Sequence, residues 1–193
     1  MVEMLGVLAI VGVLSAGALA GYSKAMQMYK VNRFTDDFNY FLGHAMTFSV
    51  DSSTNANSAG DLDFSTAAQS LGLLNGALRL HQGKVYDIFQ NFFEFYYVAG
   101  QDGHYRVRYQ LTNSEHTQRL CEQLIKIGQS YSQNLQHIGI YNYEGGLQDS
   151  QAIYGDSFCT AGRKCLSNIG LKEMNESCSF CITQKCYFYF FWN

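Results

Sequence analysis

The sequence contains no proline, has no excess of positive charge and lacks the short motifs of common catalytic sites. Without proline, no ring can remove a backbone donor and kink a helix anywhere in the chain. A net charge of −3 argues against a basic surface for nucleic acid or anionic lipid. The glycine-rich nucleotide loops, the HExxH zinc motif and the GxSxG nucleophile elbow are all missing. We therefore expect a protein that is not an enzyme and that uses no cofactor.

The most apolar stretch comes first, from Met1 to Ala20, and it contains one charged side chain, Glu3. A helix of about 20 residues spans a hydrocarbon layer of about 30 Å. A carboxylate inside that layer costs at least about 2.5 kcal/mol, so it needs a polar partner. No other side chain in the stretch can neutralise it. We expect the partner to come from another copy of the chain.

Val2-Glu3-Met4-Leu5, together with the apolar run from Val7 to Ala16, resembles the N-terminal signature of type IV pilins and the related pseudopilins. The resemblance covers roughly residues 1–30. It implies that a prepilin peptidase removes a basic leader ahead of Met1 and that the new N-terminal residue is methylated. It further implies that Glu3 pairs with the N-terminal ammonium of a neighbouring subunit, here assigned to Met1.

By the same resemblance, membrane lipid holds the subunit in the inner membrane until an assembly platform polymerises it. The product is a homo- or hetero-polymeric filament, either a pilus at the cell surface or a pseudopilus in the periplasm. Two features depart from the family: the register starts late, and Ala20 stands where many members carry a helix-breaking proline. Gly12, Gly17 and Gly21 can supply local weakness instead, because glycine disfavours helix.

Other interpretations of the N-terminal segment stay open. A secretory signal peptide would end at the small residues Ala18-Leu19-Ala20, but Glu3 stands where such a peptide carries positive charge. A single-pass anchor that holds a non-polymerising binding domain explains the length of the segment and leaves Glu3 unexplained. Within the resembled family, a pseudopilin of a type II secretion system competes with a pilin of an adhesion or motility pilus.

The pattern beyond Ala20 predicts an α+β fold in three parts: a transmembrane or filament-core helix over 1–21, its amphipathic continuation over 22–50, and a disulfide-stabilised head over 51–193. The long helix would pack on an antiparallel sheet, and the C-terminal region would be rich in disulfides. An apolar residue recurs every three or four positions along the second part, as a one-sided helix requires, at Val31, Phe34, Phe38, Phe41, Ala45 and Phe48.

The head begins with a polar linker over 51–63 and a short predicted helix over 64–74, capped by Asp63 and stopped at Asn75-Gly76. Strands are predicted over 84–98 and 105–111, joined by a two-residue Asp-Gly turn. That turn pairs Val98 with Val107, Tyr96 with Tyr109, Glu94 with Leu111, and sets Tyr97 opposite Arg108 on the other face. Solvated arginines on an outer strand face are far commoner than a nucleic-acid platform, so we expect no nucleic-acid partner.

A capping box at Thr112-Asn-Ser-Glu115 predicts a helix that runs to about Tyr131. The inner face of this helix is expected to consist of Leu120, Cys121, Leu124, Ile127 and Gly128. Residues 136–143 alternate weakly and suit a strand, whereas residues 144–176 read as loop. Six consecutive aromatic residues follow Cys186 and predict a buried last strand, because an exposed one would aggregate.

Six cysteines behind a membrane-inserting segment indicate three disulfides in an oxidising compartment. The candidates are Cys121, Cys159, Cys165, Cys178, Cys181 and Cys186. Their pairing is open, although a bridge from Cys121 to the C-terminal cluster is preferred. A zinc site on Cys178-Ser-Phe-Cys181 with Cys165 and Cys186 is the rival, but no second CxxC and no nearby histidine supports it. We therefore expect no metal.

Overall fold

The structure is a computed structural model that describes residues 2–48, 61–98, 104–112, 116–142, 150–179, 181 and 185–193. The side chains of residues 2–10, 16 and 61 lie outside this description. The elements are, in chain order, α1 (Val2–Ala45), β1 (Asp61–Asp63), β2 (Arg79–His81), β3 (Lys84–Tyr86), β4 (Phe92–Val98), β5 (His104–Leu111), α2 (Thr117–Ser130), β6 (Leu135–Asn142), β7 (Ser150–Tyr154), the 3₁₀ turns η2 (Asp156–Phe158) and η3 (Leu166–Asn168), α3 (Leu171–Ser179) and β8 (Cys186–Trp192).

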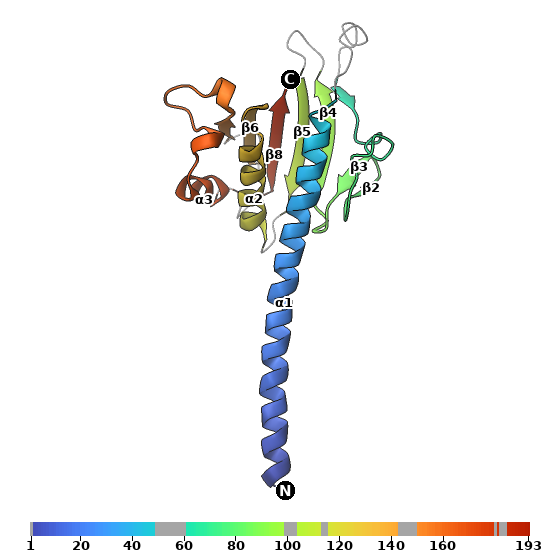
Figure 1. The fold of residues 1–193 in the computed structure, drawn as a ribbon, viewed down its shortest axis with the longest axis vertical. Helices are drawn as coiled ribbons and strands as arrows, with labels where there is room; N and C mark the ends of the chain where they lie inside the picture. Colours follow the sequence, from blue (N-terminus) through green and yellow to red (C-terminus); the bar gives the residue numbers. More distant parts are fainter. Residues whose placement is uncertain are drawn as a thin grey trace.

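Helix α1 is a single helix of 44 residues, so it is about 66 Å long. Its C-terminal third lies on the head, and the remainder extends away from the head as a continuous rod (Figure 1). The predicted stripe is buried in the head at Val31, Phe34, Phe38, Phe41 and Ala45, and Phe48 is partly buried. The prediction of one long helix is therefore confirmed. A division into an apolar and an amphipathic half at residue 21 stays a prediction.

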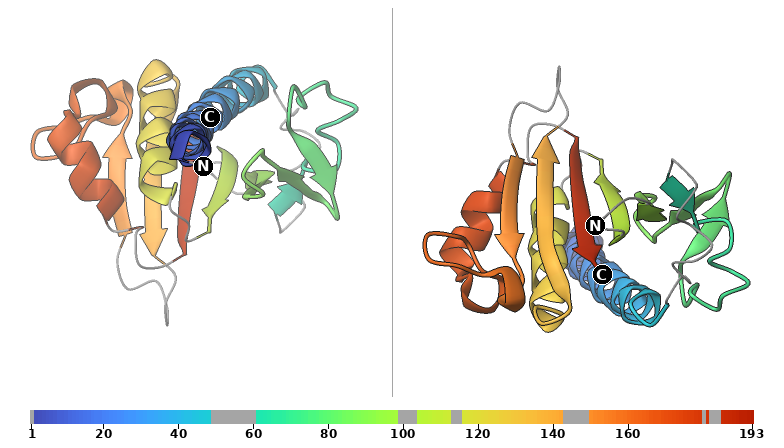
Figure 2. Two further views of the ribbon diagram at one scale, coloured as in Figure 1. Left: turned by 90° about the horizontal axis from the view of Figure 1, so that it is seen from below. Right: turned by 90° about the horizontal axis from the view of Figure 1, so that it is seen from above.

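The head is one antiparallel sheet with strand order β2-β3-β4-β5-β8-β6-β7, and β1 pairs with the end of β4 that β3 leaves free. Strand β8 is the last in the chain but lies in the middle of the sheet, between β5 and β6 (Figure 2). The alternating side chains Cys186, Phe188, Phe190 and Trp192 are buried. The predicted buried last strand is thus confirmed, as is a strand at about 136–143.

Helices α1 and α2 lie side by side on one face of the sheet, and α3 lies beside α2 at the β7 edge (Figures 1 and 2). The core between α1 and the sheet is aromatic. The Phe38 ring centroid lies 5.3 Å from Phe93, 5.4 Å from Tyr109 and 5.4 Å from Phe190. The α+β class is therefore shown. In the described part of the chain, no helix covers the opposite face of the sheet, which we call the outer face (Figure 2).

The predicted register of the β4–β5 hairpin is wrong. Phe95 lies opposite Val107 and Glu94 lies opposite Arg108, so Glu94 shares the outer face with the arginine. The alternation predicted for β5 is correct, because Tyr105, Val107, Tyr109 and Leu111 are all buried. Strand β4 ends at Val98 and β5 begins at His104, so the connection between them is longer than the predicted two-residue turn. This register packs Phe93 and Phe95 against α1. The predicted register would place Tyr96 and the Glu94 carboxylate there instead. Burying a carboxylate against an apolar helix costs more free energy than burying a phenylalanine ring.

Three other local predictions need correction. Residues 64–74 form successive turns instead of a helix. Helix α2 begins at Thr117, and its N-cap residue is His116, which makes no side-chain capping bond. Thr112 is therefore not the cap of this helix. Residues 113–115 of the predicted capping box lie outside the described residues. The expected loop over 144–176 contains β7, two 3₁₀ turns and the start of α3. The predicted inner face of α2 is confirmed, because all five of its residues are buried.

Candidate assembly surface

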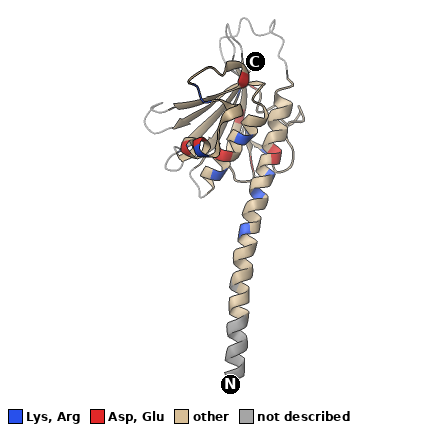
Figure 3. Cartoon of the chain, turned by 60° about the vertical axis from the view of Figure 1, so that its left-hand side comes forward, with Lys and Arg blue, Asp and Glu red and all other residues tan. Residues whose placement is uncertain are grey.

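The part of α1 that precedes Val31 carries large apolar side chains that nothing else in the described chain covers. Val13, Leu14 and Leu19 are 74%, 67% and 70% exposed. Tyr22, Met28 and Tyr29 continue this exposed surface toward the head. The first charged side chain after Glu3 is Lys24 (Figure 3). Single exposed apolar residues are ordinary on soluble proteins, but a contiguous set on an isolated helix marks a contact surface.

The two residues assigned to assembly are Met1 and Glu3, at the start of the chain. Met1 and the Glu3 side chain both lie outside the described residues, although the backbone of Glu3 belongs to α1. Among the helices whose side chains the structure describes, none carries an apolar stretch long enough to cross a membrane.

A buried polar contact fixes α1 to the head at the point where the helix meets it. The Asp37 carboxylate is buried and lies 3.1 Å from Arg33 Nε, one turn earlier on α1. Its Oδ2 atom also accepts a 2.8 Å hydrogen bond from the backbone N–H of Ala77. Gly76 makes the close approach of this loop possible, because its φ is +59° and a Cβ atom there would collide with Arg33 and Asp37. The exposed part of α1 therefore continues directly from a segment that these contacts hold against the head.

All six candidate cysteines form disulfides. Cys121–Cys178 joins α2 to α3 across 57 residues and confirms the predicted bridge from Cys121 to the C-terminal cluster. Cys159–Cys165 and Cys181–Cys186 close short segments, the second directly before β8. The zinc interpretation is wrong, because all four cysteines of that proposed site are disulfide-bonded. Among the described residues, no group of three or more histidine, cysteine, aspartate or glutamate side chains could hold a metal ion.

A buried carboxylate that the sequence did not single out organises the connection between β3 and β4. Asp87 Oδ1 accepts hydrogen bonds from the backbone N–H groups of Phe89 and Asn91, at 2.8 and 2.9 Å. Asn91 Oδ1 in turn accepts bonds from the backbone N–H and the hydroxyl of Thr112, at 3.0 and 2.8 Å. Burial raises the pKa of the Asp87 carboxyl to about 6, although its hydrogen bonds to Tyr109 and the backbone oppose that rise. In the sequence, the only indication of this arrangement was the spacing Asp-x-x-x-Asn between the segments that form β3 and β4.

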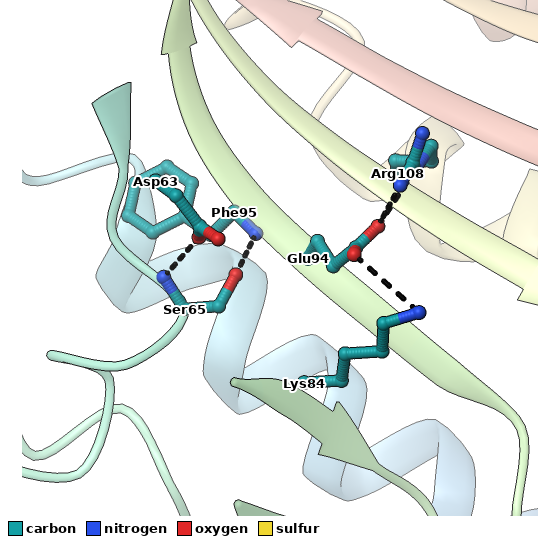
Figure 4. A network of polar contacts seen from close by, with 6 residues as sticks. All are labelled: Asp63, Ser65, Lys84, Glu94, Phe95 and Arg108. Atoms are coloured by element: carbon teal, nitrogen blue, oxygen red, sulfur yellow. Dashed lines mark hydrogen bonds and ion pairs between the residues drawn. The ribbon is translucent and has the colours of Figure 1, made fainter. Parts of the chain in front are cut away.

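A third buried carboxylate, Glu94, lies on the outer face and is neutralised there. Arg108 donates to its Oε2 atom from Nε at 2.7 Å and from Nη2, and Lys84 Nζ lies 3.8 Å from Oε1 (Figure 4). Beside it, Ser65 Oγ accepts a 2.8 Å bond from the backbone N–H of Phe95 (Figure 4). Burial and the nearby Glu94 charge raise the pKa of Tyr96 to about 12, so its hydroxyl is neutral at physiological pH. These contacts are structural, because each polar group is matched within the protein.

Comparisons of this chain with models of protein families, with curated proteins and with solved structures gave no match.

Proposed function

We propose that this protein is a structural subunit of a type IV pilin-like filament and not an enzyme. The observation that carries the proposal is the geometry of α1: an uninterrupted helix whose final third is built into the head and whose earlier part presents bare apolar side chains. The N-terminal sequence signature adds independent support. The subunit would rest in the inner membrane through residues 1–21, be processed by a prepilin peptidase, and be polymerised by an assembly platform into a surface or periplasmic filament.

Parallel packing of the rods would supply most of the cohesion. Apolar area removed from water contributes about 25 cal/mol per Å², and exposed large apolar residues of α1 recur between Val11 and Tyr29. Glu3 would select the axial alignment by pairing with the N-terminal ammonium at Met1 of a neighbour. It would add little net strength, because the cost of burying two charges offsets much of their attraction.

The proposal is tested with three variants expressed in the native host. Leu14→Asp places an unpaired charge on the exposed rod, and Glu3→Ala removes the aligning carboxylate. Lys126→Glu, an exposed change on α2, is the matched control. We expect filaments in sheared surface material from the wild type and the control, seen by negative-stain microscopy and identified by mass spectrometry. Neither α1 variant should produce them.

The stability of the head must be followed in the same variants. Neither Leu14 nor Glu3 contributes to the described core, so disulfide formation and protease resistance of the head should be unchanged. Normal filaments from both α1 variants would refute the proposal. A wild-type chain that stays monomeric in lipid would point instead to an anchored binding domain.

A further inference from the structure

The loop that holds α1 to the head contains the one Asn-Gly pair of the sequence, Asn75-Gly76. The backbone carbonyl of Asn75 accepts a 3.0 Å hydrogen bond from the N–H of Leu78, so residues 75–78 form a tight turn. Asn75 is exposed, whereas Leu78 is buried in the core. Within the described part of the chain, the Asn75 side chain makes no hydrogen bond. Its amide is therefore able to turn toward the backbone of the next residue.

The attachment requires glycine at position 76. Its φ is +59°, and a Cβ atom there would collide with Arg33 and Asp37. Glycine is also the residue that least obstructs a reaction at its own nitrogen, because no side chain shields that atom. Asparagine is a thermolabile residue, and it loses its amide most readily when glycine follows it. The turn thus combines a reactive pair with an exposed amide that no hydrogen bond restrains.

We propose that Asn75 is a site of spontaneous deamidation and that its isoaspartyl product loosens the attachment of α1. The Gly76 nitrogen attacks Cγ of Asn75, and its proton passes through water to the leaving amide nitrogen. The Cγ–Nδ2 bond breaks, ammonia departs and a cyclic imide forms. Water then opens the imide at either carbonyl, which gives aspartate or isoaspartate. The sequence consumes water and releases ammonia, so it needs no oxidant, reductant or enzyme.

The isoaspartyl product lengthens the main chain by a methylene group, because the backbone then runs through the former side chain. The carbonyl that accepts from Leu78 leaves its place in the turn, so Gly76 and Ala77 must shift. Ala77 N–H is a partner of the buried Asp37 carboxylate, to which it donates at 2.8 Å. Loss of that donor leaves Arg33 as the remaining described partner of the carboxylate, which weakens the contact between loop and helix. The inference does not depend on whether α1 assembles into filaments.

The reaction is measured on the full chain, folded in nonionic detergent and incubated for days at mildly alkaline pH in heavy-oxygen water. Only deamidation that occurs during the incubation then carries the label, and peptide mass spectrometry locates it. We expect label at Asn75 to accumulate at least about tenfold faster than at Asn134 and Asn168. These two asparagines are also exposed, but Leu135 and Ile169 follow them, and a bulky side chain obstructs the attack.

A blocked variant and an unfolded reference complete this first test. Asn75→Gln keeps an amide but would have to close a larger ring, so it should fold normally and gain no label at this position. The wild type unfolded in urea gives the rate that the sequence has without the turn. Label at Asn75 in urea but none in the folded chain would overturn the inference, and so would equal rates at the three asparagines.

The second test follows the attachment itself. Anion exchange separates the deamidated chains, because each carries an additional negative charge. Hydrogen–deuterium exchange over 76–78 should be at least about tenfold faster in the isoaspartyl fraction than in the unmodified chain. Asn75→Asp is the matched control, since it adds the charge without the methylene group, and it should exchange like the wild type. An isoaspartyl fraction that exchanges like the wild type, or an Asn75→Asp variant that exchanges like the isoaspartyl fraction, would refute the loosening by a longer backbone.

Discussion

The hydroxyl of Tyr109 donates a hydrogen bond to Oδ2 of Asp87 and so joins the middle of β5 to the connection between β3 and β4. Both residues are buried, and the Tyr109 ring also lies 5.6 Å from Phe34 and 5.4 Å from Phe38 on α1. The Tyr109 ring therefore contacts α1, and its hydroxyl contacts the buried carboxyl of Asp87. Burial raises the pKa of this carboxyl.

Asp87 should make the stability of the head fall as pH rises from about 4 to 6. Burial raises the pKa of its carboxyl from 3.8 to about 6, so in this window the folded chain holds a proton that the unfolded chain has released. Stability from this group is greatest below the lower value and is lost as pH passes the higher one. A shift of this size corresponds to at most roughly 3 kcal/mol. Above about pH 6 the group adds no further slope.

Asp87→Asn isolates this contribution, because the amide keeps the size of the carboxyl and cannot ionise. Urea unfolding of the wild type and the variant at several values between pH 4 and about 7 gives the two free-energy profiles. We expect the difference between them to change across the window, with the variant relatively more stable at the higher pH. Parallel profiles would contradict the assignment.

Gly76→Ala should destabilise the head by more than about 1–2 kcal/mol, the ordinary cost of a left-handed backbone conformation at a residue with a side chain. Its Cβ would also displace the Arg33–Asp37 pair that attaches α1 to the loop. Gly72→Ala is the matched control, since its φ is +69° but no atom lies within 4 Å of the added Cβ. Thermal unfolding should rank Gly76→Ala below Gly72→Ala, and equal melting temperatures would count against the attachment.

Removing the Cys121–Cys178 disulfide with a double alanine variant should lower the free energy of unfolding by roughly 4 kcal/mol, because the bridge closes a long segment of the unfolded chain. The Cys159–Cys165 bridge spans only 6 residues, so the same treatment there should cost roughly 2 kcal/mol. Denaturant unfolding under non-reducing conditions compares the two variants. A larger loss for the short bridge would contradict this ranking.

Phe38→Ala should lower the free energy of unfolding by about 3–5 kcal/mol, because the ring is fully buried between α1 and the sheet. Tyr40 lies two residues later on the same helix and is 36% exposed, so Tyr40→Ala should cost less than about 1 kcal/mol. The comparison is made by urea unfolding at one pH. Similar losses for the two variants would show that the helix is not seated through Phe38.

The sequence predicted features that depend on local periodicity. The stripe along α1, the inner face of α2 and the alternation in β5 follow from side chains a few residues apart, and all three are found in the structure. The aromatic run after Cys186 predicted burial of β8 without indicating its neighbours. The bridge from Cys121 was expected because that residue faces inward on α2.

The incorrect predictions depended on contacts between distant segments. The prediction of which β4 residues face the core was based on the position of the turn. In the structure, the packing of Phe93 and Phe95 on Phe41 determines which residues face the core. No local pattern indicated that Glu94 and Arg108 would share a face, or that Phe191 would lie opposite Arg106. Asp87 is polar in sequence, yet it is buried in the structure, where it accepts a hydrogen bond from Tyr109. The candidate assembly residues Met1 and Glu3 stay predictions.

The central position of β8 has a consequence for how the head forms during synthesis. Translation produces α1 first and delivers every other strand of the sheet before the one that joins β5 to β6. Until β8 emerges from the ribosome, no strand can join β2–β5 to β6–β7, and β5 and β6 each lack the neighbour that pairs with them in the folded head. The N-terminal helix is therefore available to targeting factors well before the domain it carries can close, and a chaperone that shields bare strand edges would act in that interval.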